Sequence, residues 1–138
     1  MREILFRGKR ADNGQWVYGD LIHTRGGHPL ICARHDFGSI VEGVEVDYNT
    51  VCQYTGMIDK NGNKIFEGDI IESHSLSGDI ARHRIGFDES MGCYIATLLI
   101  GRQAGYFFQL NQKWIVECDK VIAGNVYDNP EQTKGGEL

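Results

Sequence analysis

The chain has 138 residues, of which 41% are hydrophobic and 24% charged, and its formal net charge at pH 7 is -5. This composition excludes a disordered chain, and the absence of a long apolar run argues against a membrane-spanning helix. The acidic balance also argues against wholesale attraction to nucleic acid or anionic membranes, because both need clustered Lys and Arg. The charged start MREILFRGKR is not followed by a signal-peptide pattern, so we expect a cytoplasmic protein.

Eighteen glycines, two prolines and frequent turn signals favour many short strands over helices. Ile4 to Arg10 and Gln15 to Thr24 are predicted to form a hairpin, since Asp12-Asn13-Gly14 suits a turn with positive φ. Asn129-Pro130-Glu131 is predicted to begin one helical turn. Further strands are expected over residues 28–33, 44–48, 51–54, 64–67, 70–73, 82–88, 93–100, 107–110, 114–118 and 121–127.

One phrase occurs twice, as NGQWVYGDLI at residues 13–22 and as NGNKIFEGDII at residues 61–71. In each copy Gly-Asp precedes two apolar residues. Gly allows a bulge or a positive φ, and Asp accepts hydrogen bonds from neighbouring amides, so the phrase predicts a device for entering a strand. In the alternative reading, Asp20 and Asp69 meet as paired acids for proton transfer or metal binding. We expect the turn role for both.

The motifs of several common chemistries are missing. We find no GxxxxGK[ST], GxSxG, HExxH or zinc-finger spacing. Cys32 and His35 have a metal-like local spacing, but a site would need two more ligands, for example Cys52 or His28. The favoured interpretation is a partly buried cysteine beside a surface histidine. We therefore predict no catalytic residue, no metal and no cofactor. The four cysteines are expected to be small buried hydrophobes without disulfides.

Basic residues supply the candidate nucleic-acid contacts, which are Arg7, Lys9, Arg10, Arg82 and Arg84. Strand alternation puts Arg82 and Arg84 on one face and His83 on the other. If the arginine face lay near the aromatic residues at 106–108, it would resemble the surface of proteins that bind single strands. Ordinary burial preferences favour the other reading, in which the aromatic residues are core and the arginines solvated.

Three blocks of the sequence resemble the signature of the YopX-like family of phage and prophage proteins. They are FRGKRADNGQWVYGDLI (6–22), QYTGMIDKNGNKIFEGDII (53–71) and VIAGNVYDNPE (121–131), in the order and at separations similar to those of the family. The resemblance implies a protein encoded in a mobile element, with an SH3-type barrel in its C-terminal part. It brings no activity and no catalytic residue.

The patterns and the resemblance together predict a mainly β protein with a single YopX-like domain. An N-terminal β-hairpin region, residues 1–56, is expected to pack on an SH3-type small barrel, residues 57–130, followed by a frayed tail, residues 131–138. Because small barrels have open strand edges, we expect a homo-oligomer.

For function, we expect a phage accessory protein that is not an enzyme and that acts by self-assembly or by binding a phage or host protein. Two alternatives stay open. One is a nucleic-acid-binding module that uses the basic residues, and the other is a small hydrolase with a site around His23, Cys32 and His35.

Overall fold

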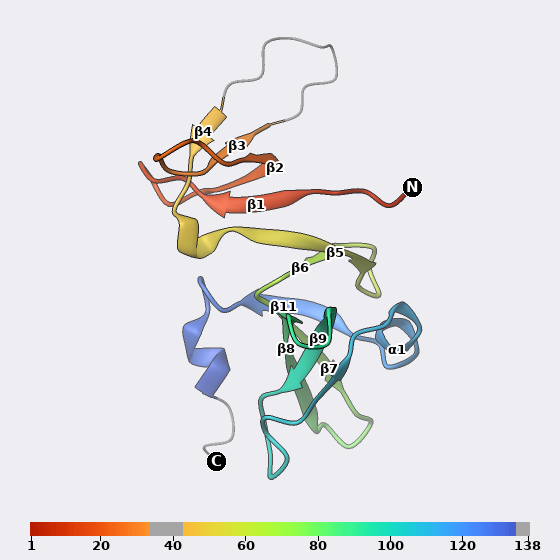
Figure 1. The fold of residues 1–138 in the computed structure, drawn as a ribbon. Helices are drawn as coiled ribbons and strands as arrows, with labels where there is room; N and C mark the ends of the chain where they lie inside the picture. The colour runs from red at the N-terminus through yellow and green to blue at the C-terminus, as the bar shows by residue number, and fades with distance from the viewer. Residues whose placement is uncertain (34–42, 135–138) are drawn as a thin grey trace. The chain divides into compact units, whose positions relative to one another are not determined.

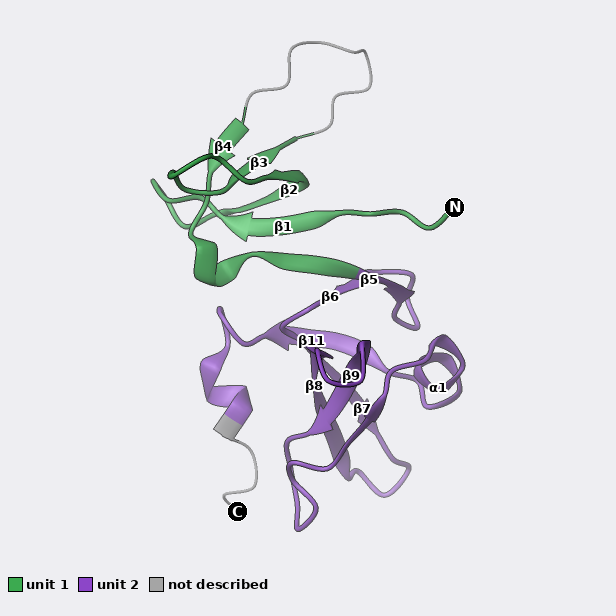
Figure 2. Cartoon of the chain, viewed as in Figure 1, with its two compact units in different colours: residues 1–54 green, residues 55–138 purple. Residues whose placement is uncertain are grey.

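The computed structural model describes residues 1–33 and 43–134 and is mainly β, as expected (Figure 1). The chain divides into two compact units, residues 1–54 and 55–138 (Figure 2). Strand β5, Cys52–Ile58, begins in the first unit and ends in the second. No helix in the described ranges has the length and apolar character that crossing a membrane requires.

The first unit is an antiparallel sheet in the strand order β4-β3-β2-β1-β5. Its strands are β1 (Phe6–Lys9), β2 (Trp16–Ile22), β3 (Leu30–Cys32), β4 (Gly43–Glu45) and the start of β5, which follows the 3-10 turn η1 (Tyr48–Thr50). The predicted hairpin is confirmed as β1 and β2. At its turn Gly14 has a φ of 72°, and the Asn13 side chain accepts a hydrogen bond from the Gln15 amide at 2.9 Å.

Buried apolar side chains hold this first sheet together. Ile31 and Val46 are fully buried, and Cys52 is 1% exposed. Gly8 in β1 makes room for them, because a Cβ there would lie 3.1 Å from Val46. Of the four cysteines, all in the described ranges, none forms a disulfide, and Cys118 is exposed rather than buried.

The two copies of the repeated phrase have different roles. Gly68 adopts a φ of 84° just before β7, and the buried Asp69 carboxylate accepts a hydrogen bond from the Phe66 amide at 2.8 Å. The strand-entry prediction is therefore confirmed for the second copy. Gly19 instead lies inside β2, where a Cβ would overlap the Cys32 carbonyl oxygen of β3. In the first copy, the glycine therefore allows β2 and β3 to lie close together.

The second unit contains an antiparallel sheet in the strand order β10-β9-β8-β7-β11, and β6 lies beside the end of β5. Its elements are β6 (Lys64–Phe66), β7 (Asp69–His74), β8 (Ile80–Asp88), β9 (Cys93–Leu98), β10 (Phe107–Gln109), α1 (Gln112–Glu117), β11 (Val121–Asn125) and the 3-10 turn η2 (Pro130–Lys134). Figure 1 shows α1 and η2 at opposite ends of β11.

One face of this second sheet carries the core of the unit. The core consists of Ile65, Ile71, Ile85, Ala96, Leu110 and Ile115. Met57, Tyr94, Trp114 and Ile122 pack against it. Burying an isoleucine side chain stabilises the folded state by about 1.5 to 3 kcal/mol, so the four isoleucines of this core contribute strongly to the stability of the unit.

Two predictions need correction in this unit. Residues 114–118 were predicted as a strand, but residues 112–117 form α1, because Asn111 caps the helix by accepting a hydrogen bond from the Trp114 amide at 2.8 Å. The SH3-type barrel is not confirmed, because the sheet is open, with β10 and β11 at its two edges. The predicted helical turn near Pro130 is confirmed as η2.

Candidate functional site

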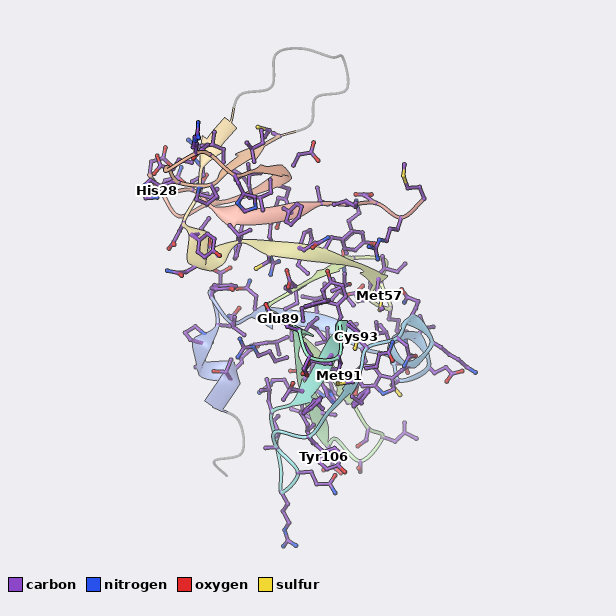
Figure 3. All side chains as sticks on the ribbon, viewed as in Figure 1. His28, Met57, Glu89, Met91, Cys93 and Tyr106 are labelled. Atoms are coloured by element: carbon purple, nitrogen blue, oxygen red, sulfur yellow. The ribbon has the colours of Figure 1, made fainter. Side chains whose placement is uncertain are left out.

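The β10 edge of the second unit is the first candidate surface. All three residues of β10 are exposed, and Phe107 and Phe108 keep 46% and 37% of their surfaces accessible. Tyr106 precedes the strand with 71% accessible and lies in the segment between β9 and β10 (Figure 3). A shallow, mostly apolar hollow is lined by residues 104–107. Consecutive exposed aromatic residues are uncommon on a protein that binds nothing.

The backbone of β10 offers hydrogen bonds away from the sheet. The Leu98 amide donates to the Tyr106 carbonyl at 2.8 Å, and the Leu110 amide donates to the Tyr94 carbonyl at 2.9 Å. Since bonded residues alternate along an antiparallel pair, Phe108 faces β9 with its backbone groups. Phe107 and Gln109 therefore direct their N–H and C=O groups outward. An added strand can bind at such an edge.

A second candidate site surrounds a buried lysine in the same unit. Lys120 is 3% exposed, and its Nζ donates a hydrogen bond to the Ser73 hydroxyl at 2.7 Å. The same Nζ lies 5.0 Å from the centroid of the Trp114 ring. Burial lowers the pKa of Lys120, because the charged ammonium loses its hydration.

His83 also belongs to this second site, which we call the lysine cluster and which consists of Ser73, His83, Trp114 and Lys120. Its ring makes edge-on contacts with Trp114 and Phe108, at centroid distances of 5.0 and 5.7 Å. Burial, followed by the positive charge of Lys120, lowers the pKa of His83 from 6.5 to about 4. Its Nδ1 is buried and has no hydrogen-bond partner. The cluster therefore combines a neutral imidazole and a buried amine, both beside the Trp114 ring, with a hydroxyl that is hydrogen-bonded to the amine.

The N-terminal basic residues lie in the first unit and contact an aromatic ring and a carboxylate. Arg7 is 5% exposed, and its guanidinium carbon lies 4.5 Å from the centroid of Trp16. The Lys9 Nζ lies 5.4 Å from the same ring. Arg10 forms two hydrogen bonds with Asp12, at 2.8 and 2.9 Å. The structure thus brings Arg7 and Lys9 together on Trp16, which covers part of their surface.

Arg82 and Arg84 lie on one face of β8 and His83 on the other, as predicted. Arg82 donates to the Glu72 carboxylate at 2.8 and 3.0 Å, which leaves that guanidinium half-buried. Arg84 is exposed and forms no ion pair within the described ranges. Its register partner is Thr97, whose partner in β10 is Phe107. Arg84 and Phe107 therefore share the face opposite the core.

The other residues considered from the sequence form no cluster as far as the structure describes them. The Asp69 carboxylate accepts a hydrogen bond from the Phe66 amide within its own turn, whereas Asp20 is exposed in β2. His23 is exposed and Cys32 is buried, while His35 lies outside the described residues. Within the described part of the chain, no three His, Cys, Asp or Glu side chains gather in a way that could hold a metal ion.

The sequence reasoning missed Ser73, Lys120 and the outward backbone of β10. Ser73 and Lys120 are 47 residues apart, and they meet because Glu72 pairs with Val121, which places their neighbours side by side. Strand register between distant segments leaves no local pattern that sequence reading could use. The edge position of β10 likewise depends on the order of the strands in the sheet.

Comparisons with known proteins agree with this architecture. A family model described as YopX protein matches residues 5–134. The crystal structure of protein EF1440 from Enterococcus faecalis is similar, with a TM-score of 0.59 and 20% sequence identity over 96% of this chain and 99% of that chain. At this identity the likeness shows the fold alone. A search of curated proteins found no match.

Proposed function

Because this chain belongs to the YopX protein family, we propose that it is a phage-type accessory protein that acts by protein–protein binding through β10. The observation that carries this proposal is the open edge, with three exposed residues and two outward-facing sets of backbone groups. Backbone hydrogen bonds supply affinity for an added strand, and the exposed phenylalanines supply apolar area.

The partner that fits this edge most simply is a second copy of the chain. Two β10 strands can meet antiparallel around a twofold axis. The outward N–H and C=O groups of Phe107 and Gln109 in one copy then form hydrogen bonds with those of the same two residues in the other copy. The backbone of the edge is then complementary to itself. Pairing also removes exposed aromatic surface, which favours association by about 25 cal/mol for each Å² of apolar surface buried.

Size-exclusion chromatography with light scattering over a concentration series tests this pairing. The wild type is expected to approach the mass of a dimer as concentration rises. Gln109→Pro removes an outward N–H and leaves the bonds to β9 in place, so it should remain monomeric.

The matched control is Gln109→Thr, which changes the same side chain but keeps the N–H. This variant should associate like the wild type. A wild type that stays monomeric, or a proline variant that associates as strongly as the wild type, would count against pairing at β10.

A nucleic-acid-binding role is the second candidate, because Arg84 and Phe107 share one sheet face with Thr97 between them. A cation beside an exposed ring suits a single-stranded backbone and its bases. Fluorescence anisotropy with labelled single-stranded DNA at low salt tests it. Arg84→Ala should weaken binding more than Arg82→Ala, since Arg82 is held by Glu72. Absence of binding by the wild type would remove this candidate.

A further inference from the structure

Lys120 is an unusual residue to bury in the second unit. The residue as a whole is 3% exposed, yet no carboxylate of the described ranges pairs with it. Burial lowers the pKa of Lys120, because the charged ammonium loses its hydration, so the amine gives up its proton more easily than in an exposed lysine. A neutral amine is a base, and it lies within hydrogen-bond distance of a hydroxyl.

The partner of that amine has the position of a nucleophile. Ser73 Oγ lies 2.7 Å from Lys120 Nζ, and Ser73 is half-buried near the end of β7, whereas Lys120 is buried. A serine becomes nucleophilic when an adjacent base accepts its proton, and lysine serves as that base in some serine enzymes. The 2.7 Å between Ser73 Oγ and Lys120 Nζ is within the hydrogen-bond distance that such a pair requires.

A histidine and a tryptophan lie near the pair. Ser73 pairs with Ala81 across β7 and β8, and His83 lies two residues further along β8 on the same face. Such diagonal neighbours lie about 7 to 8 Å apart, with their Cβ atoms somewhat closer. His83 Nδ1 is buried without a partner, and it can donate a hydrogen bond when that nitrogen carries the proton. Trp114 packs against both Lys120 and His83.

We propose that Ser73 and Lys120 form a nucleophile–base pair that hydrolyses carboxylic esters with an apolar acyl group. Ser73 Oγ gives its proton to the Lys120 amine and forms a bond to the carbonyl carbon of the ester. The ester C–O bond then breaks, and the departing alkoxide takes the proton from Lys120 and leaves as an alcohol. Water then gives a proton to the same amine and attacks the acyl carbon of the acyl-serine. The bond between that carbon and Ser73 Oγ breaks, Oγ takes the proton back from Lys120, and the acid is released.

An ester fits this site better than an amide, because an alkoxide leaves a tetrahedral intermediate more readily than an amine does. Burial lowers the pKa of Lys120, so a larger share of the amine is neutral near neutral pH than in an ordinary lysine. This activity is separate from binding at β10, since Ser73 lies in β7 and Lys120 directly precedes β11.

A fluorophosphonate probe tests the pair directly. The serine oxygen forms a bond to phosphorus, fluoride leaves, and the proton goes to the base. Intact-mass spectrometry with peptide mapping should find an adduct on Ser73 of the full-length wild type. Ser90 is the internal control: its exposed hydroxyl donates to the Asp88 carboxylate at 2.6 Å but has no amine beside it. We expect Ser73 to react at least about tenfold faster than Ser90.

Variants and pH then separate the roles. Ser73→Ala should abolish the adduct at this position, and Lys120→Met should slow the reaction of Ser73 by at least about tenfold while Ser90 reacts as before. The wild type gives a further test without any substitution. Its rate of reaction at Ser73 should rise with pH, and the midpoint of that rise should lie below about 10.4, the pKa of a free lysine. No adduct on Ser73, equal rates at Ser73 and Ser90, or a rate unaffected by Lys120→Met would overturn the proposal.

Discussion

Asp59 is a buried carboxylate that ties a turn to a distant strand. Its Oδ1 accepts hydrogen bonds from the Asn61 and Asn63 amides at 2.9 Å, and its Oδ2 accepts one from the Ile122 amide at 3.0 Å. Burial alone would raise the pKa of Asp59, but these amides outweigh it and the pKa is lowered. The carboxylate thus stays charged and holds the turn before β6 against β11.

Replacing Asp59 by Ala should destabilise the protein by about 2 to 3 kcal/mol, because three amides lose a charged acceptor. Urea unfolding followed by circular dichroism measures the change. Glu117→Ala is the control, since Glu117 forms only an exposed pair with Lys113 at 3.9 Å and should change stability by less than about 1 kcal/mol. Equal losses in the two variants would contradict this role for Asp59.

His83 should make the stability of the protein depend on pH. Its pKa in the folded state is about 4, against 6.5 for an ordinary histidine, so between these values the unfolded chain binds the extra proton. Stability is therefore expected to fall as the pH drops from 6.5 to about 4, by up to about 3 kcal/mol.

The measurement is urea unfolding at several pH values for the wild type and for His83→Phe. Phenylalanine keeps a ring between Phe108 and Trp114 but cannot titrate, so the difference in stability between the two proteins should change over this pH window. Parallel pH profiles for the wild type and the variant would show that His83 does not cause the loss.

At the scale of elements, α1 depends on the residue that caps its N-terminus as much as on its apolar face. The helix has six residues and no acidic residue in its first turn, so the Asn111 cap is its main local stabilisation. The helix presents Ile115 to the core and Trp114 to Lys120 and His83. Loss of the cap should therefore loosen both the core and the lysine cluster.

Asn111→Ala is expected to cost about 1 kcal/mol, whereas Asn111→Asp keeps an acceptor at the cap and should cost little. Thermal unfolding gives the stability, and near-ultraviolet circular dichroism reports the packing of Trp114. A similar loss in both variants would mean that the cap is not what holds α1.

The elements also show where reading the sequence succeeds. The hairpin around Asn13-Gly14 and the turn at Gly68-Asp69 carry local signals, and both were predicted. The segment 114–118 was predicted as a strand because its run of branched and aromatic residues suits one, and a six-residue helix is too short to show a helical period. Gly19 looked like a strand-entry glycine, but its role depends on β3, which is distant in sequence.

At the scale of the whole molecule, the fold class and the family could be predicted from the sequence, but whether the sheet closes into a barrel could not. Repeated turn signals predict a mainly β chain, and the three signature blocks point to the YopX family, which the match over residues 5–134 establishes. Barrel closure depends on whether the terminal strands β10 and β11 pair, and no local pattern encodes that. The open edge at β10 is the feature on which the proposed function depends.

Amide hydrogen exchange as a function of protein concentration tests that claim most directly. Phe107 and Gln109 direct their amides outward, whereas Phe108 faces β9, so the three neighbours act as probe and control in one strand. Pairing of two copies predicts that exchange at Phe107 and Gln109 slows as concentration rises, while exchange at Phe108 stays slow throughout. Fast exchange at Phe107 and Gln109 at every concentration would contradict the proposed binding edge.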